Sequence, residues 1–178
     1  MITAHVFIAA SLDGFIARKD HTLDWLPQEK VEGEDPGYDT FIESVEGLIM
    51  GRASFKNVLS FGDWPYQKPV IVLSKTLTDN DIPKELKNKV EISQLSPEKI
   101  MQSVQDRGWK RVYVDGGQVV QSFIRAGLIE DLIITFIPIL IGDGQRLFGP
   151  VSKDINLKLI NSKAFGSGMV QNQYKIIS

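Results

Sequence analysis

Two short apolar stretches of the sequence run into glycine at the start of a helix, an arrangement suited to binding an anion. In the first, Val112–Val114 predicts a buried strand, Asp115–Gly117 a tight turn, and Gln118–Ala126 an amphipathic helix. The N-terminus of a helix exposes unpaired backbone N–H groups, and glycine lets an anion approach the main chain closely. A phosphate is therefore the natural ligand of this junction, although two glycines before a helix also form simple turns.

The second junction of this kind lies earlier in the chain and adds a positive charge. The apolar strand predicted over Leu48–Met50 leads into Gly51, Arg52 and Ser54, where another helix begins. Two such junctions in one short chain, one with a cation and a hydroxyl, indicate a polyanionic ligand. If the first junction holds a pyrophosphate, a side chain at Gly117 should obstruct the ligand more than it destabilises the fold.

A third group of polar side chains follows another buried strand. Val70–Leu73 is continuously apolar, which is typical of a strand inside a parallel sheet, and it ends at Ser74–Lys75–Thr76. Ligands of open α/β sheets bind outside the carboxyl ends of the strands, so these hydroxyl and ammonium groups are candidate ligand contacts. The alternative interpretation is the solvated start of a loop.

The carboxylates of a predicted helix over residues 38–46 are candidates for acid chemistry. Asp39 lies in its first turn, and Asp35 lies just upstream. A carboxyl group placed beside a reducible bond can deliver a proton. An acid in the first turn of a helix also complements the helix dipole, and such residues are common.

The remaining patterns predict an α/β fold in one domain over residues 1–178, because this length suffices for one core and is short for two. Ser96 and Pro97 mark a helix start, and Gly108 its end. No long helix is expected after residue 128, so the chain should close with antiparallel strands. The extended candidates are Thr3–Ala10, Phe15–Ala17, Val90–Ile92, Ile129–Phe136, Leu157–Ser162 and Met169–Ile177.

Composition narrows the classes of partner. The net charge is −2 and no block of Lys and Arg is present, which argues against a nucleic-acid surface. The absence of cysteine removes disulfides, thiolate metal sites and a cysteine nucleophile, and it fits a reducing cytoplasm. The longest apolar run, Leu132–Ile141, is too short to span a bilayer. His5 and His21 share no spacing typical of a metal site, so we expect no metal and regard both as incidental.

Several of these motifs together resemble a known family. IMGRASF (Ile49–Phe55), VIVLSK (Val70–Lys75) and VYVDGGQVVQSF (Val112–Phe123) occur in the order and rough spacing of the dihydrofolate reductase fold. IPILIGDGQRLF (Ile137–Phe148) and SLDGFIA (Ser11–Ala17) resemble more specifically the C-terminal reductase domain of the bifunctional deaminase/reductase of bacterial riboflavin biosynthesis. The resemblance implies a three-layer fold with a mixed, mostly parallel sheet, flanking helices and a C-terminal antiparallel hairpin. Since the deaminase's zinc motif needs cysteine, we expect a free-standing relative.

The resemblance also implies NADPH as cofactor and a homodimer. The pyrophosphate would lie on the two glycine–helix junctions, the 2′-phosphate on the residues after the strand that ends at Leu73, and the nicotinamide near the end of the first strand. The cofactor-binding residues expected on this basis are Ala9, Ala10, Gly51, Arg52, Ser54, Leu73, Ser74, Lys75, Gly116, Gly117, Gln118 and Val119.

By the same resemblance, the activity would be hydride transfer from NADPH to a small conjugated heterocycle or imine, pyrimidine- or pterin-like. Such an enzyme would be similar to 5-amino-6-(5-phosphoribosylamino)uracil reductase or to dihydrofolate reductase. Asp39, or Asp35, lies close to the place of the acidic residue on the first helix of dihydrofolate reductases and could supply the proton. The alternative is a nucleotide- or flavin-phosphate-binding module that has kept the pocket without catalysis.

Overall fold

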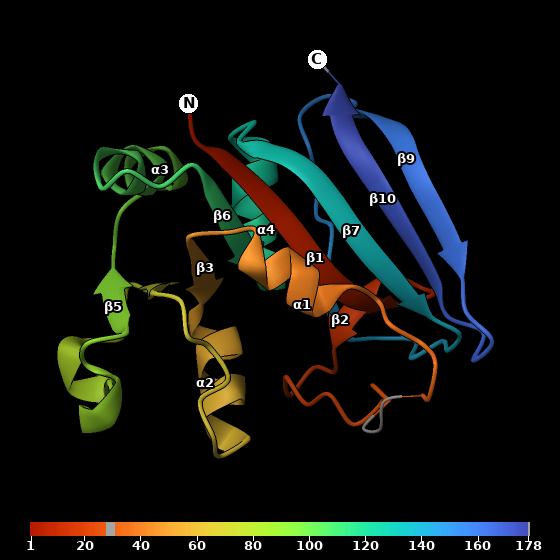
Figure 1. Cartoon of the computed structure of the whole chain (residues 1–178), viewed down its shortest axis with the longest axis horizontal. Coiled ribbons are helices and arrows are strands. Elements are labelled where there is room, and N and C mark those ends of the chain that lie inside the picture. Colours follow the sequence, from red (N-terminus) through yellow and green to blue (C-terminus); the bar gives the residue numbers. More distant parts are fainter. Residues whose placement is uncertain (28–30, 178) are drawn as a thin grey trace.

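The fold is known from a computed structural model that describes residues 1–27 and 31–177 (Figure 1). The α-helices are α1 (Tyr38–Glu43), α2 (Arg52–Ser60), α3 (Pro97–Asp106) and α4 (Gly117–Arg125), and two short 3-10 helices cover Asp79–Asp81 and Lys84–Leu86. The strands are β1 (Thr3–Ser11), β2 (Phe15–Ala17), β3 (Gly47–Gly51), β4 (Val70–Leu73), β5 (Val90–Ser93), β6 (Arg111–Asp115), β7 (Ile129–Ile137), β8 (Gln145–Arg146), β9 (Asn156–Ala164) and β10 (Val170–Ile177).

One eight-stranded sheet organises the molecule, in the order β5-β4-β3-β6-β1-β7-β10-β9 (Figure 1). Neighbouring strands from β5 to β7 pair in parallel, whereas β10 pairs antiparallel with both β7 and β9. The prediction of a mostly parallel sheet that closes with a C-terminal antiparallel hairpin is therefore confirmed. Because β1, β3, β4 and β6 are parallel, their carboxyl ends meet at one edge of the sheet.

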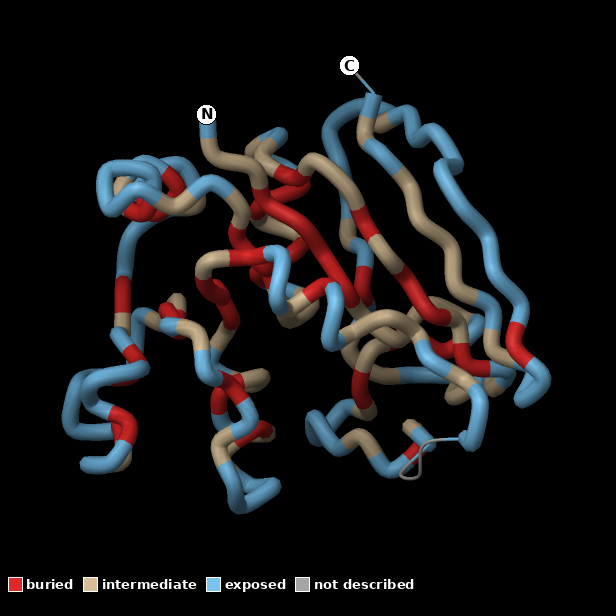
Figure 2. The backbone as a smooth tube through the Cα atoms, viewed as in Figure 1, coloured by how far each residue is buried: buried red, intermediate tan, exposed pale blue. Residues whose placement is uncertain are grey.

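Helices cover both faces of the sheet, which gives the three layers. Along β1, Val6 and Ala10 face a core cluster that includes residues of α3 and α4, whereas Phe7 faces a second cluster with residues of α1 and α2. This separation follows from the alternation of side chains along a strand. Figure 2 shows the buried chain concentrated in the central strands.

Strand β9 lies outside this protected core. It forms one edge of the sheet, and each of its nine residues is exposed (Figure 2). Its apolar side chains are among those that face solvent, with Leu157, Leu159 and Ile160 44%, 52% and 50% exposed. An apolar edge strand presents unpaired backbone groups and uncovered side chains, and so it is suited to pairing with another chain.

Two expectations from the sequence need correction. The first helix ends at Glu43 rather than Glu46, because the Glu46 carboxylate accepts hydrogen bonds from the backbone N–H groups of Lys110 and Arg111, 3.0 and 2.7 Å away. His5 is not incidental. Its side chain is buried, and its Nδ1 lies 2.9 Å from Asp131 Oδ2, which ties β1 to the start of β7.

Candidate active site

A cavity of about 1830 Å³ opens at the carboxyl edge of the parallel strands. This volume exceeds the roughly 300–1,000 Å³ of a typical small-molecule site, which leaves room for a dinucleotide and a second ligand. The structure brings nearly all of the residues predicted from the sequence to its wall. They are Ala9, Asp35, Asp39, Gly51, Arg52, Ser54, Leu73, Ser74, Lys75, Gly116, Gly117, Gln118 and Val119.

Ala10 differs from the other expected contacts. Its side chain is fully buried in the cluster beneath α3 and α4, and it is not part of the cavity wall. Ala9 lines the cavity instead, because consecutive residues of a strand point to opposite faces of the sheet.

The N-termini of α2 and α4 lie side by side in this cavity. Their N-cap residues are Gly51 and Gly116, and neither helix start is capped by a side-chain hydrogen bond. A Cβ atom built on Gly116 would lie 3.8 Å from the backbone nitrogen of Gly51, so the two starts are in contact distance. Uncapped N–H groups and two positive dipole ends converge here, and this combination favours an anion.

The two glycines at the start of α4 are also required by the fold itself. Gly116 has a φ of +91°, and a Cβ there would lie 2.6 Å from Ser54 Oγ. A Cβ at Gly117 would lie 2.7 Å from the backbone oxygen of Arg146 and 3.0 Å from Ile16 Cδ1. A side chain at Gly117 would therefore have to displace β8 as well, and the expectation that it mainly obstructs a ligand stays a prediction.

Two cations lie near the end of β4, Arg52 at the start of α2 and Lys75 in the loop after β4. Arg52 Nη1 donates to Thr76 Oγ1 over 3.0 Å, which brings the start of α2 to the loop after β4. Ser74 Oγ accepts from the N–H groups of Thr76 and Leu77, over 3.2 and 3.0 Å, and so fixes the turn. Neither Arg52 nor Lys75 takes part in an ion pair with any residue that the structure describes. Both positive charges are thus available to a ligand.

Asp115 is a further ionisable residue of the cavity, which the sequence pattern indicated only as part of a turn. Burial raises the pKa of its carboxyl group above the ordinary value, against hydrogen bonds from Ser54, the Gly116 backbone and Tyr113. The Ser54 hydroxyl is therefore engaged by Asp115. The signal in the sequence was an acid at the carboxyl end of a buried strand, at the edge where ligands bind.

Three tyrosines of the cavity wall, Tyr38, Tyr66 and Tyr113, lie close enough to this carboxyl group to feel its charge. Burial, followed by the nearby charge of Asp115, raises the pKa of Tyr38 to about 12, and the same causes raise the pKa values of Tyr66 and Tyr113. The phenol of Tyr113 donates to the backbone oxygen of Phe7 over 2.8 Å and lies 3.3 Å from Asp115 Oδ1. All three phenols stay protonated at neutral pH, and together with Phe7 they form a mainly aromatic wall suited to a flat ring.

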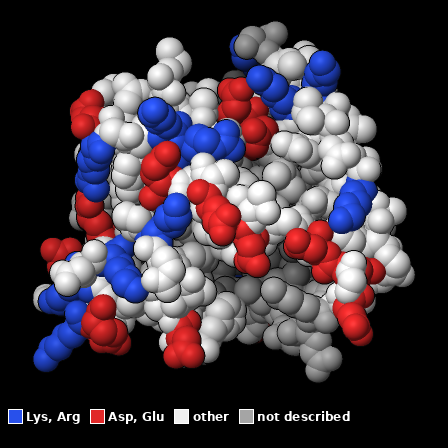
Figure 3. All heavy atoms as spheres, viewed as in Figure 1, with Lys and Arg blue, Asp and Glu red and all other residues white. Residues whose placement is uncertain are grey.

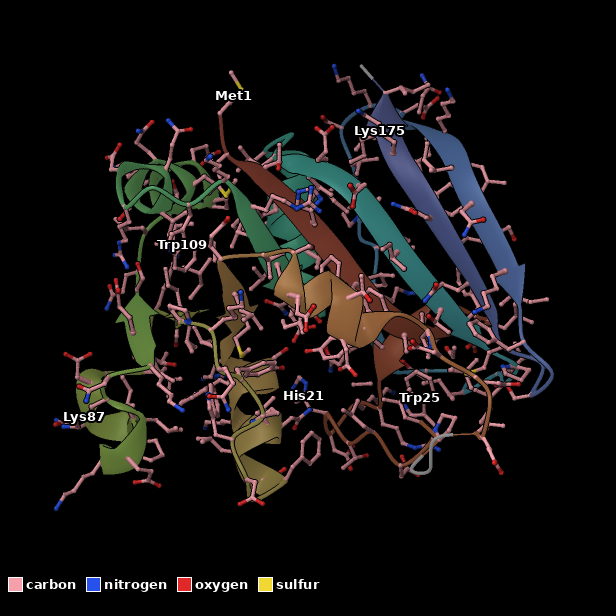
Figure 4. All side chains as sticks on the ribbon, viewed as in Figure 1. Met1, His21, Trp25, Lys87, Trp109 and Lys175 are labelled. Atoms are coloured by element: carbon pink, nitrogen blue, oxygen red, sulfur yellow. The ribbon has the colours of Figure 1, made fainter. Side chains whose placement is uncertain are left out.

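The loop after β2 contributes residues to the cavity wall. His21 lines the cavity, and its backbone oxygen accepts from Asn57 Nδ2 of α2 over 2.7 Å; Figure 4 places His21 beside that helix.

Throughout residues 1–27 and 31–177, no group of three or more His, Asp or Glu side chains is arranged to hold a metal ion. In that same part of the chain, no helix has the length and hydropathy to cross a membrane. Acidic and basic side chains are interspersed over the face in Figure 3.

Comparison with known proteins identifies the family. The sequence model of the RibD C-terminal domain matches residues 3–171. The chain belongs to this family. A solved structure from Shewanella sp. PV-4, whose name assigns it provisionally to riboflavin biosynthesis, is 37% identical with a TM-score of 0.92, over 99% of this chain and 100% of that one.

Two further relatives differ in what their names say. The protein YwjB of Bacillus subtilis, whose name states no function, is 29% identical over 165 residues, or 92% of each chain. The bifunctional diaminohydroxyphosphoribosylaminopyrimidine deaminase/5-amino-6-(5-phosphoribosylamino)uracil reductase of Thermotoga maritima is 16% identical, with a TM-score of 0.74. This chain covers 57% of the Thermotoga protein and shares its fold over that part.

Proposed function

We propose that this RibD C-terminal domain protein is one domain that acts as an NADPH-dependent reductase. It transfers a hydride to a small conjugated heterocycle or imine of the pyrimidine or pterin kind. The observation that carries the proposal is the convergence of two uncapped helix N-termini and two unpaired cations, Arg52 and Lys75, on one cavity with an aromatic wall. The name of the Thermotoga relative supports a phosphoribosylaminouracil as the substrate class.

The residues of the cavity fit NADPH. The starts of α2 and α4 would hold the pyrophosphate, because their N–H groups are uncapped and lie next to each other. Lys75 and Arg52, with the turn at Ser74, would hold the 2′-phosphate, and Ala9 would border the nicotinamide. When bound, the cofactor supplies the hydride, while the protein orients it and excludes water.

A C=N acceptor needs a proton as well as a hydride, and two carboxyl groups could supply it. Asp115 faces the aromatic part of the cavity, and burial raises its pKa, so its carboxyl group holds a proton more readily than an ordinary aspartate. Asp39 is exposed at the rim of the cavity. We therefore assign the proton to Asp115 and keep Asp39, predicted from the sequence, as the alternative.

We further propose a cytoplasmic homodimer. The chain has no cysteine, which suits a reducing compartment. Strand β9 offers a second copy an exposed edge with Leu157, Leu159 and Ile160 uncovered, beside a pocket of about 390 Å³ lined in part by Phe148 and Val151. Pairing across this edge would remove apolar surface from water and satisfy the open backbone groups.

Calorimetric titration with NADPH and NADH tests the cofactor assignment. NADPH should bind more tightly by about 1–3 kcal/mol, because Lys75 and Arg52 make charge-assisted contacts with the 2′-phosphate. The gap should shrink at high salt. Changing Lys75 to Ala should weaken NADPH and leave NADH nearly unchanged, whereas Lys87→Ala, remote from the cavity (Figure 4), should change neither.

Equal affinities for NADPH and NADH would refute the assignment of a 2′-phosphate site. If neither cofactor binds, the assignment of a nicotinamide cofactor is refuted. Turnover separates the reductase from a binding module on the same fold. A reductase oxidises NADPH when 5-amino-6-(5-phosphoribosylamino)uracil or a related acceptor is supplied, whereas a binding module only changes the fluorescence of the cofactor.

A further inference from the structure

Thr135 is a buried polar residue that borders the cavity but belongs to none of the groups considered so far. It lies on β7, is 5% exposed, and forms part of the cavity wall. In the sheet it is paired with Ala9 of β1 on one side and with Gln171 of β10 on the other. Thr135 therefore lies next to the strand position that would border the nicotinamide.

The side chain of Gln171 fixes the role of the Thr135 hydroxyl. Gln171 Nε2 lies 3.0 Å from the backbone oxygen of Pro36 and 3.0 Å from Thr135 Oγ1. A backbone oxygen can only accept, so the amide must present its nitrogen, and the two hydrogens of that nitrogen are used by these two contacts. The hydroxyl oxygen of Thr135 is thus an acceptor toward Gln171, and its own proton is left to donate elsewhere.

The Pro36 carbonyl is held in place by the hairpin between β9 and β10. The Glu34 carboxylate accepts from the Ser167 backbone N–H and hydroxyl, over 2.7 and 2.6 Å. Lys163 Nζ donates to the backbone oxygen of Asp35 over 3.2 Å. These contacts anchor the two residues before Pro36 and so hold its carbonyl in place, and Gln171 cannot easily turn its amide and reverse the polarity.

Within the described chain, the Thr135 hydroxyl has no second hydrogen-bonding partner. A buried hydroxyl proton without an acceptor is unfavourable, and a ligand in the cavity is the available acceptor. We propose that Thr135 donates this hydrogen bond to the substrate, with Gln171 as its positioning residue, and that the substrate presents an acceptor there, such as a ring carbonyl oxygen. This inference rests on the proposed function for the substrate class, a pyrimidine- or pterin-like ring. It adds the residue that recognises a hydrogen-bond acceptor on that ring.

The test compares four variants of the full chain with 5-amino-6-(5-phosphoribosylamino)uracil, which carries ring carbonyl groups, as the probe. Thr135→Val removes the hydroxyl with little change of shape, and Thr135→Ser retains it. Gln171→Glu keeps the hydroxyl but replaces the donating amide by an acceptor, so that Thr135 donates to residue 171 instead. Gln173→Glu makes the same change two residues along β10, opposite Ile133 and outside the cavity wall, and is the matched control.

We expect KM for the probe to rise about tenfold in Thr135→Val and in Gln171→Glu, since each leaves the substrate acceptor without its donor. Thr135→Ser should stay within about twofold of the wild type, and Gln173→Glu should be unchanged. The affinity for NADPH, measured by calorimetry, should be the same in all variants. Thermal melting confirms that each is folded, and Thr135→Ser and Gln171→Glu keep the comparison valid if Thr135→Val melts early.

Unchanged KM in Thr135→Val, or in Gln171→Glu, would overturn the inference. So would weaker NADPH binding in both, because the hydroxyl would then donate to the nicotinamide carboxamide. If the wild-type protein binds NADPH but neither binds nor reduces the probe, the inference that Thr135 donates to a ring carbonyl of the substrate is overturned. The assignment of the cofactor would still stand. Failure to bind NADPH would instead refute the proposed function, so the two failures are distinguishable.

Discussion

The close approach of β8 to the start of α4 makes a sharp prediction about Gly117. An alanine there would place its Cβ 2.7 Å from the backbone oxygen of Arg146, which also accepts from Gln121 Nε2 over 2.9 Å. Because the nearest atom belongs to the backbone, no rotamer change relieves the contact, and β8 must move. Gly51→Ala is the matched control, since its Cβ would meet only Val119 Cγ2, at 3.1 Å, a side-chain atom that needs to shift by only a few tenths of an ångström.

The expected cost follows from the two contacts. Overpacking against a fixed neighbour costs about 1–3 kcal/mol, whereas the Val119 contact should cost less than about 1 kcal/mol. Replacing glycine also lowers the entropy of the unfolded chain by a similar amount at both sites, so this gain cancels in the comparison. For a chain of this length, 1 kcal/mol corresponds to roughly 2–4 °C, so the contact with Arg146 should lower the melting temperature of Gly117→Ala by about 2–12 °C relative to a glycine replacement that meets no neighbour.

The assay is thermal melting of both variants without ligand, followed by NADPH titration below the transition. If Gly117→Ala melts with the wild type, or no lower than Gly51→Ala, the approach of Arg146 does not constrain the fold. Normal NADPH affinity in a destabilised Gly117→Ala would show that this glycine serves the packing of β8 alone. Loss of both NADPH affinity and stability would show that the fold and the ligand each require the absence of a side chain at residue 117.

The remaining predictions concern the carboxyl groups and the edge strand. Asp115→Asn should lower turnover and leave NADPH affinity unchanged, whereas Asp39→Asn should leave both unchanged; the reverse pattern in steady-state kinetics would restore Asp39 as the acid. Since burial raises the Asp115 pKa, this carboxyl group favours the folded state below its unfolded pKa of about 3.9, and that advantage is lost as pH rises through the folded value. Asp115→Asn should therefore raise the melting temperature near pH 7 but not near pH 3, and a gain that does not depend on pH would contradict the buried charge. Leu159→Lys should yield monomers in sedimentation experiments, whereas Leu140→Lys, which is also exposed but lies outside β9, should not. A wild-type protein that sediments as a monomer would refute the proposed dimer.

The elements of this fold were predictable because their signals are local. The apolar run of Val70–Leu73 and the helical spacing of Val119, Val120, Phe123 and Ile124 depend only on neighbours in sequence, and both elements are present. The first helix was overextended, since the Glu46 carboxylate is withdrawn from it by backbone groups of residues 110 and 111. Contacts over such separations leave no trace in a local pattern.

The same limit applies to the site. The polar residues at the strand ends could be placed on one edge, because parallel strands bring their carboxyl ends together. The protonation preference of Asp115 could not, since it arises from burial among side chains of α1, α2 and the loop before β4.

The polarity of Thr135 depends on still more distant parts of the chain. A hydroxyl can donate or accept, and nothing in the sequence around residue 135 favours either role. The choice is made by Gln171, 36 positions along the chain, and Gln171 is oriented by Pro36, 135 positions away from it. Specificity for a hydrogen-bond acceptor in the substrate would thus originate in the C-terminal hairpin, outside the nucleotide-binding motifs. Relatives with the same helix N-termini but another residue at 171 should therefore bind the same cofactor and accept different rings.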